Sequence, residues 1–129
     1  MNTKKGCEVP LTVYADKEKI RQVFINLIDN AIKYGKQNGI VEASVYKIDG
    51  KRILIEISDD GSGIAEEHIG RIFERFYRTD HARSRKVGGS GLGLAICKHI
   101  IEAHHQSIHV RSAIDVGTTF GFTLESRKD

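Results

Sequence analysis

The sequence predicts an α/β protein built as a two-layer α/β sandwich, in which a mixed sheet of about five strands carries helices on one face. The expected order of elements supports this class: strand, helix, two strands, short helix and loop, long helix, two strands. Two stretches with helical apolar spacing supply the covering layer. Alternation of apolar and polar residues over 41–46 is typical of a strand whose second face meets solvent. A length of 129 residues suits a single domain, 1–129, with one core.

The first strand and the first helix are predicted to follow each other directly. Residues 12–15 have strand character, and Asp16 is placed to cap a helix, since its carboxylate can accept N–H groups of the first turn. From Ile20 to Ala31 apolar residues recur at three- and four-residue spacing. Gly35 then provides the predicted end of the helix.

The remaining elements follow from alternation, turn residues and helical spacing. Residues 41–46 and 53–57 are predicted to form an antiparallel hairpin around Asp49-Gly50. A short helix is expected over 66–73, and a mobile basic loop over 77–89. A long helix is expected over 92–103, before two strands, 108–111 and 118–124, that pair around the turn 115–117.

Composition and charge exclude several classes of protein. No apolar run approaches the roughly 20 residues that span a bilayer, so a soluble, cytoplasmic domain is expected. Cys7 and Cys97 stand far apart, which argues against disulfides and zinc. The net charge of +3 comes mostly from a basic stretch over 71–86. A local basic loop suits a phosphate-bearing ligand, and no nucleic acid partner is expected.

The first predicted helix carries amide and ammonium groups along one edge. Asn26, Asn30 and Lys33 fall at i, i+4 and i+7. An amide oxygen is a suitable Mg²⁺ ligand, and an ammonium can meet phosphate. The alternative is an ordinary solvated helix edge.

Two glycine-containing segments complete the polar constellations. Asp59 begins an Asp-Asp-Gly-Ser-Gly turn at the end of a strand, where it could accept a hydrogen bond from a base amino group. A plain Asp/Gly turn is the alternative. Residues 88–94 open directly into a helix and form a potential anion site. Their spacing matches neither the dinucleotide-binding fingerprint nor a P-loop.

Together these segments resemble the sequence boxes of bacterial sensor histidine kinases, in the same order and over about nine tenths of the chain. Residues 26–34 resemble the N box, 59–63 the G1 box, 72–78 the F box, 89–94 the G2 box and 117–120 the terminal strand motif. The F box distinguishes this family from the related gyrase, Hsp90 and MutL ATPases. The resemblance implies the Bergerat-type ATP-binding fold.

By position, the resemblance implies ATP and Mg²⁺ as ligands, with Asn26, Asn30 and Lys33 as the catalytic residues. Asn30 would coordinate Mg²⁺, Asp59 would accept the adenine amino group, and Lys33 and Tyr34 would contact phosphate or sugar. Basic residues of the loop between the F and G2 boxes, the ATP lid, would contact the phosphates. The full set expected at the nucleotide comprises Asn26, Asn30, Lys33, Tyr34, Asp59, Gly61, Gly63, Ile64, Tyr77, Arg78, Arg83, Arg85, Lys86, Gly89, Ser90, Gly91, Leu92, Gly93, Leu94 and Thr119.

The residue type at position 26 distinguishes the kinases of this resemblance from the related ATPases. Related ATPases carry a glutamate one turn before the magnesium asparagine, whereas a carboxamide cannot accept a proton near neutral pH. The domain is therefore expected to hold ATP until a histidine nucleophile arrives. Alternatives are a serine kinase of the anti-sigma type and a degenerate docking module; an ATPase machine is disfavoured by Asn26.

Two departures and one absence qualify the resemblance. His104-His105-Gln106 stands where the family has His-Gly-Gly, so the helix ends without glycine or holds His105 in an unusual conformation. Asp115 replaces a turn glycine. No histidine has the H-[DE]-x-x-x-P context of a phosphoacceptor, and Pro10 is the only proline. The expected partner is therefore a separate histidine-bearing dimerisation domain, and indirectly a response regulator. The parent kinase would be membrane-anchored, and this chain monomeric.

Overall fold

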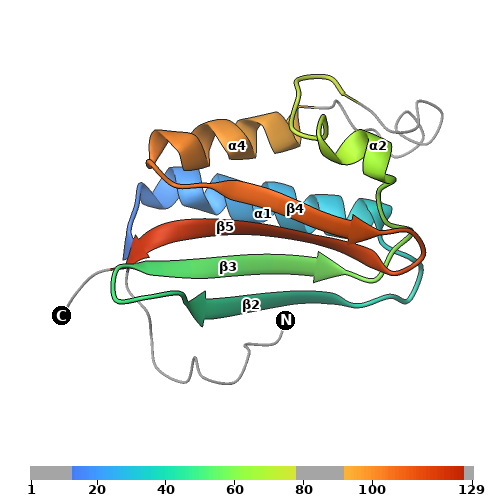
Figure 1. Cartoon of the computed structure of the whole chain (residues 1–129), viewed down its shortest axis with the longest axis horizontal. Coiled ribbons are helices and arrows are strands. Elements are labelled where there is room, and N and C mark those ends of the chain that lie inside the picture. The colour runs from blue at the N-terminus through green and yellow to red at the C-terminus, as the bar shows by residue number, and fades with distance from the viewer. Residues whose placement is uncertain (1–12, 78–91, 127–129) are drawn as a thin grey trace.

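The computed structural model describes residues 13–77 and 92–126. Their elements are β1 (Val13–Tyr14), α1 (Lys17–Tyr34), β2 (Val41–Lys47), β3 (Arg52–Asp59), α2 (Glu66–Ile69), α4 (Gly93–Ala103), β4 (Ile108–Ala113) and β5 (Gly117–Ser126). α1 and α4 pack against each other and cover one face of the sheet (Figure 1). The predicted two-layer α/β arrangement is present. No helix among the described residues has the length and hydropathy needed to cross a membrane.

The sheet is antiparallel at each of its described pairings, so the prediction of a mixed sheet is wrong. β2 pairs with β3, β3 with β5, and β5 with both β4 and the two-residue β1. β3 and β4 run in the same direction, but β5 lies between them. No parallel pair therefore forms. Four strands are long, and β1 adds a short fifth segment.

α1 forms where its sequence predicts. The Asp16 carboxylate accepts the Lys19 N–H at 3.2 Å and caps the first turn. Gly35 ends the helix in an extended conformation, with its N–H donating to the Ala31 carbonyl at 2.9 Å. The glycine is thus needed for space: a Cβ at residue 35 would lie 2.6 Å from that carbonyl oxygen.

The core lies between the helices and the sheet. α1 contributes Leu27 and Val23, β3 contributes Ile57, and β5 contributes Phe120 and Phe122, each at most 2% exposed. The Cys97 thiol of α4 is also buried, and burial raises its pKa to about 11. A buried thiol with a raised pKa has little thiolate character at neutral pH.

The open face of the sheet is more protected than expected. We expected Ser44 and its polar neighbours to meet solvent, but Ser44 is only 3% exposed and Glu56 only 6%. The register places them in one row with Gly121 and His109. The His109 ring lies over Gly121, where a Cβ would be 2.6 Å from Nε2, and Arg111 Nη1 bonds Glu56 Oε2 at 2.6 Å. Long side chains of the sheet therefore shield its own polar face.

The loop predictions are partly testable. The short helix ends at Ile69 rather than at residue 73, and the chain continues to Tyr77 through turns closed by three-residue hydrogen bonds. The predicted mobile loop and the basic residues Arg78, Arg83, Arg85 and Lys86 lie outside the described residues. The same holds for Gly89, Ser90 and Gly91 of the expected anion site.

Candidate nucleotide site

Asn26 joins the polar edge of α1 to the start of α4. Its Nδ2 donates to the Gly93 carbonyl at 3.3 Å, and its Oδ1 accepts a hydrogen bond from Gln22 at 2.8 Å. A carboxylate at this position would lose the donor to Gly93 and would bring negative charge to a carbonyl oxygen. A carboxamide therefore suits the local geometry as well as the expected chemistry.

Asn30 and Lys33 follow on the same helix. Asn30 is half-buried and makes no hydrogen bond to the described residues. None of them therefore competes with a metal ion for its amide oxygen. Lys33 Nζ pairs with Asp29 at 3.1 Å on the outer side of the helix. Lys33 would have to leave this partly exposed pair in order to meet a phosphate.

The G1 turn packs against the last turn of α1. A Cβ at Gly61 would lie 2.5 Å from the Tyr34 carbonyl oxygen, so only glycine allows this approach. Asp59 Oδ1 accepts the Gly61 N–H at 2.8 Å. Burial raises the pKa of Asp59, while the N–H groups of Gly61 and Thr118 oppose that rise. A half-buried acceptor of this kind is suited to a base amino group.

Two further glycines hold the β4–β5 turn against G1. Gly63 has φ of 80°, and a Cβ there would lie 2.2 Å from the Ala113 carbonyl oxygen. Gly117 has φ of 142°, and a Cβ there would lie 2.0 Å from the Asp59 carbonyl oxygen. Both positions thus require glycine for conformation and for space.

Ser112 links the G1 turn to the β4–β5 turn, a structural role that the sequence analysis did not identify. Its hydroxyl accepts the Ile64 N–H at 2.7 Å and donates to the Gly117 carbonyl at 2.8 Å. Asp115, with φ of 63°, donates its N–H to the Ser62 carbonyl at 2.9 Å. One feature of the sequence could have indicated Ser112. It is polar, whereas Val110 and Ile108, which precede it at two-residue spacing on the same strand face, are apolar.

The register places the side chains of Thr119 and Asp59 on opposite faces of the sheet. Thr119 pairs with Ser58, and their hydroxyls hydrogen-bond at 2.8 Å, on the face that also carries Glu56. Thr118 instead pairs with Asp59 and is buried. Since side chains alternate along a strand, Thr118 is the threonine that shares a face with Asp59.

Tyr77 is held inside the F box. Its hydroxyl hydrogen-bonds His68 Nδ1, and the Arg71 guanidinium lies 4.6 Å from its ring centroid. Arg71 also forms an ion pair with Glu74 at 3.1 Å. Within the described residues, Tyr77 therefore serves to fix the F-box turns.

The described part of the G2 box forms the beginning of α4. Gly93 is the first helical residue, and Leu94 packs against the core. No side chain of the described residues caps this helix at Leu92. N–H groups of the first turn are therefore oriented as an anion site requires.

Metal binding would depend on the nucleotide. Among residues 13–77 and 92–126 no group of three or more His, Cys, Asp or Glu side chains could hold a metal ion. Mg²⁺ commonly binds through few protein ligands together with substrate phosphates. Asn30 fits that pattern, because its half-buried amide has no partner among these residues.

Comparison with known proteins places this geometry in a family. The family described as histidine kinase-, DNA gyrase B- and HSP90-like ATPase matches residues 15–128. The chain is 42% identical over 120 residues to sensor histidine kinase WalK of Bacillus subtilis, covering 92% of this chain and 20% of WalK. It thus spans about a fifth of that relative.

Solved structures agree with the sequence relatives. The mycobacterial sensor histidine kinase MprB superposes with a TM-score of 0.83 at 33% identity, covering 93% of this chain and 80% of that one. Full-length ShkA in complex with AMPPNP gives 0.79 at 31% identity, covering 93% of this chain and 24% of ShkA. The resemblance inferred from the sequence boxes is confirmed: this chain belongs to the histidine kinase-, DNA gyrase B- and HSP90-like ATPase family.

Proposed function

We propose that this domain binds Mg-ATP and transfers the γ-phosphoryl group to a histidine on a separate helical dimerisation domain, which passes it to an aspartate of a response regulator. The observation that carries the proposal is the position of Asn26. It lies one helical turn before Asn30 and donates a hydrogen bond to the Gly93 carbonyl. No general base stands where a water-activating glutamate would be needed. ATP would therefore persist until an external nucleophile arrives.

Each part of the site has a role in this proposal. Asp59 accepts the adenine amino group, and Gly61 and Gly63 let the turn that carries Asp59 pack closely against α1 and the β4–β5 turn. The first turn of α4 and Lys33 neutralise phosphate charge. Asn30 would hold Mg²⁺, which when bound supplies further charge neutralisation to the phosphates.

Several assignments remain proposals that rest on position alone. Tyr34 is assigned to phosphate or sugar, and Ile64 and Leu94 to the walls of the base pocket. The lid residues Arg78, Arg83, Arg85 and Lys86 are assigned to phosphate. In the strand motif, the register favours Thr118, which pairs with Asp59, over Thr119 as the threonine at the nucleotide. The names of the relatives, and the ATP analogue bound to ShkA, support ATP as the ligand. A membrane-anchored parent with this domain on its cytoplasmic side belongs to the same proposal.

Calorimetric titration with AMPPNP tests the binding step. Saturable binding that Mg²⁺ modulates and that GTP does not reproduce is expected. Asn30→Ala should abolish the Mg²⁺ dependence, whereas Asn38→Ala, in an exposed loop, should leave it intact. Absence of binding at millimolar nucleotide would instead indicate a degenerate docking module.

Transfer requires a second assay. The domain and Mg-ATP are incubated with a separately purified histidine-bearing dimerisation domain, and the labelled product is treated with acid. Acid-labile phosphate is expected, because phosphohistidine hydrolyses in acid. Acid-stable label on serine would favour the serine-kinase alternative. Rapid phosphate release without any acceptor would contradict the role given to Asn26.

A further inference from the structure

α1 carries a second apolar stripe, of which Ile28 packs partly against the core while Ile25 and Ile32 are exposed. Ile25, Ile28 and Ile32 continue from Arg21 at i+4, i+7 and i+11, the spacing of a heptad seam. Ile25 is 52% exposed and Ile32 is 65% exposed. The core stripe of Ile20, Val23, Leu27 and Ala31 lies on a different face of the helix. A seam of this kind is typical of packing against another helix.

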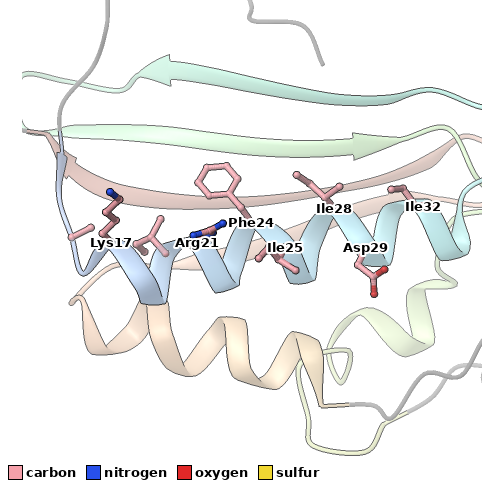
Figure 2. A pocket seen from close by; sticks show the side chains of 9 residues that line it. Lys17, Arg21, Phe24, Ile25, Ile28, Asp29 and Ile32 are labelled. Carbon is pink, nitrogen blue, oxygen red and sulfur yellow. The ribbon is translucent and has the colours of Figure 1, made fainter.

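The stripe borders a groove of about 790 Å³. Figure 2 shows Phe24 and Ile28 on the side of α1 away from α4. The opposite edge carries Asn26 and Asn30, so this groove is separate from the candidate nucleotide site. Among the described elements α1 contacts α4 on one flank and β3 and β2 beneath, and the groove flank has no helix against it.

Charges at the two ends of the groove are of opposite sign. Lys17 and Arg21 line its beginning, and Asp29 lines the part near its other end. Asp29 already pairs with Lys33, but its side chain is 57% exposed and can accept a second cation. A parallel copy of the helix would place like charges together. An antiparallel copy would place Arg21 of each chain near Asp29 of the other, and would also oppose the two helix dipoles.

We propose that this stripe binds the same stripe of a second copy of the chain, with the two α1 helices antiparallel about a two-fold axis level with Ile25. The ion pair between Arg21 of one chain and Asp29 of the other then neutralises the charges at both ends of the groove, because the two-fold axis repeats it. From Arg21 to Ile32 the seam is only about 17 Å long. The contact is accordingly weak, and suited to copies held together by other domains, whose effective concentration is about 1 mM.

Sedimentation equilibrium of the purified chain up to about 1 mM measures this contact. The wild type should form a monomer–dimer equilibrium, and Ile25→Asp should abolish it. Ile48→Asp is the matched control, because Ile48 is similarly exposed at 45% but lies in the β2–β3 connection. Circular dichroism establishes that each variant is folded. A wild type that stays monomeric, or a dimer that survives Ile25→Asp, overturns the proposal.

A charge exchange tests the antiparallel arrangement. Arg21→Asp and Asp29→Arg should each weaken the dimer by about tenfold or more, because each places like charges together twice. The double variant should recover most of the lost affinity. Single reversals that leave the dimer unchanged, or a double variant weaker than either single one, would overturn the arrangement. The oligomeric state is measured without nucleotide, so a failure of the nucleotide proposal would not affect this result.

Discussion

The two ends of α1 differ in why the backbone beside them favours glycine. At its C-terminal end the G1 turn and the β4–β5 turn meet, and Gly61 and Gly117 leave no room for a Cβ. At its N-terminal end, about 27 Å away, α4 terminates with His105 at φ of 60°. The nucleotide end requires glycine for space, whereas the far end requires only a conformation that glycine adopts more easily.

The α4 terminus shows how a side chain is tolerated there. The His105 N–H donates to the Glu102 carbonyl at 2.9 Å, and the Gln106 N–H to the Ile101 carbonyl at 3.1 Å. This is the Schellman arrangement, which usually places glycine where His105 stands. Since His105 is exposed, its side chain meets no obstacle, and the only cost is backbone strain. Steric precision is therefore concentrated where the ligand is proposed to bind.

Gly117→Ala should have the largest effect, because it adds both strain and a clash with the Asp59 carbonyl. We expect a loss of at least about 3 kcal/mol in the free energy of unfolding, measured by urea denaturation. Gly50→Ala is the control, since a Cβ there meets nothing within 4 Å. Equal effects of the two changes would remove the distinction between the two ends.

Asp59→Asn should separate binding from stability. Removing a charged acceptor is expected to reduce the preference for ATP over GTP by about tenfold or more. Burial raises the pKa of Asp59, so the folded state binds more protons than the unfolded state at pH values between 3.8 and that raised pKa. Stability is lost as pH rises through this window, and the loss persists above it.

The Asp59→Asn variant has no titrating carboxyl at this position and so lacks this loss of stability with rising pH. It should therefore be more stable than the wild type at neutral pH, and the difference should vanish below the window. Thermal melts at several pH values give the comparison. An unchanged nucleotide preference would remove Asp59 from base recognition.

His105→Gly should have the smallest effect and the opposite sign. Relief of left-handed strain exceeds the entropy that glycine loses on folding, so stability should rise by about 0.5–1 kcal/mol. Ser107→Gly, nearby and exposed but without positive φ, should lower stability by a few tenths of a kcal/mol. A destabilised His105→Gly would mean that the imidazole makes a contribution the geometry does not reveal.

Local signals predicted most elements. Asp16 and the spacing from Ile20 to Ala31 located α1, and Asp49-Gly50 located the hairpin, because capping and turn formation depend on neighbouring residues. The boxes also located Asn26, Asn30 and Asp59 on the elements where the structure has them. Their roles at the nucleotide remain predictions.

Long-range pairing could not be predicted in the same way. Nothing in the alternation of β3 and β4 indicates that β5 inserts between them, so the sheet was wrongly predicted as mixed. Thr119 was assigned from the strand motif alone, and a one-residue difference changes the face of the sheet but barely changes the sequence pattern. The burial of Glu56 depends on Arg111, 55 residues away in the sequence.

α1 and α4 are fixed to each other at both ends of α4. Asn26 holds Gly93 at one end, and at the other His104 Nε2 accepts the Asp16 N–H at 2.9 Å while Nδ1 hydrogen-bonds the Ile100 carbonyl at 2.8 Å. Helices tied in this way open as one cooperative unit. Native-state hydrogen exchange should therefore give the central amides of both helices a common opening free energy, distinct from that of the short turns around α2.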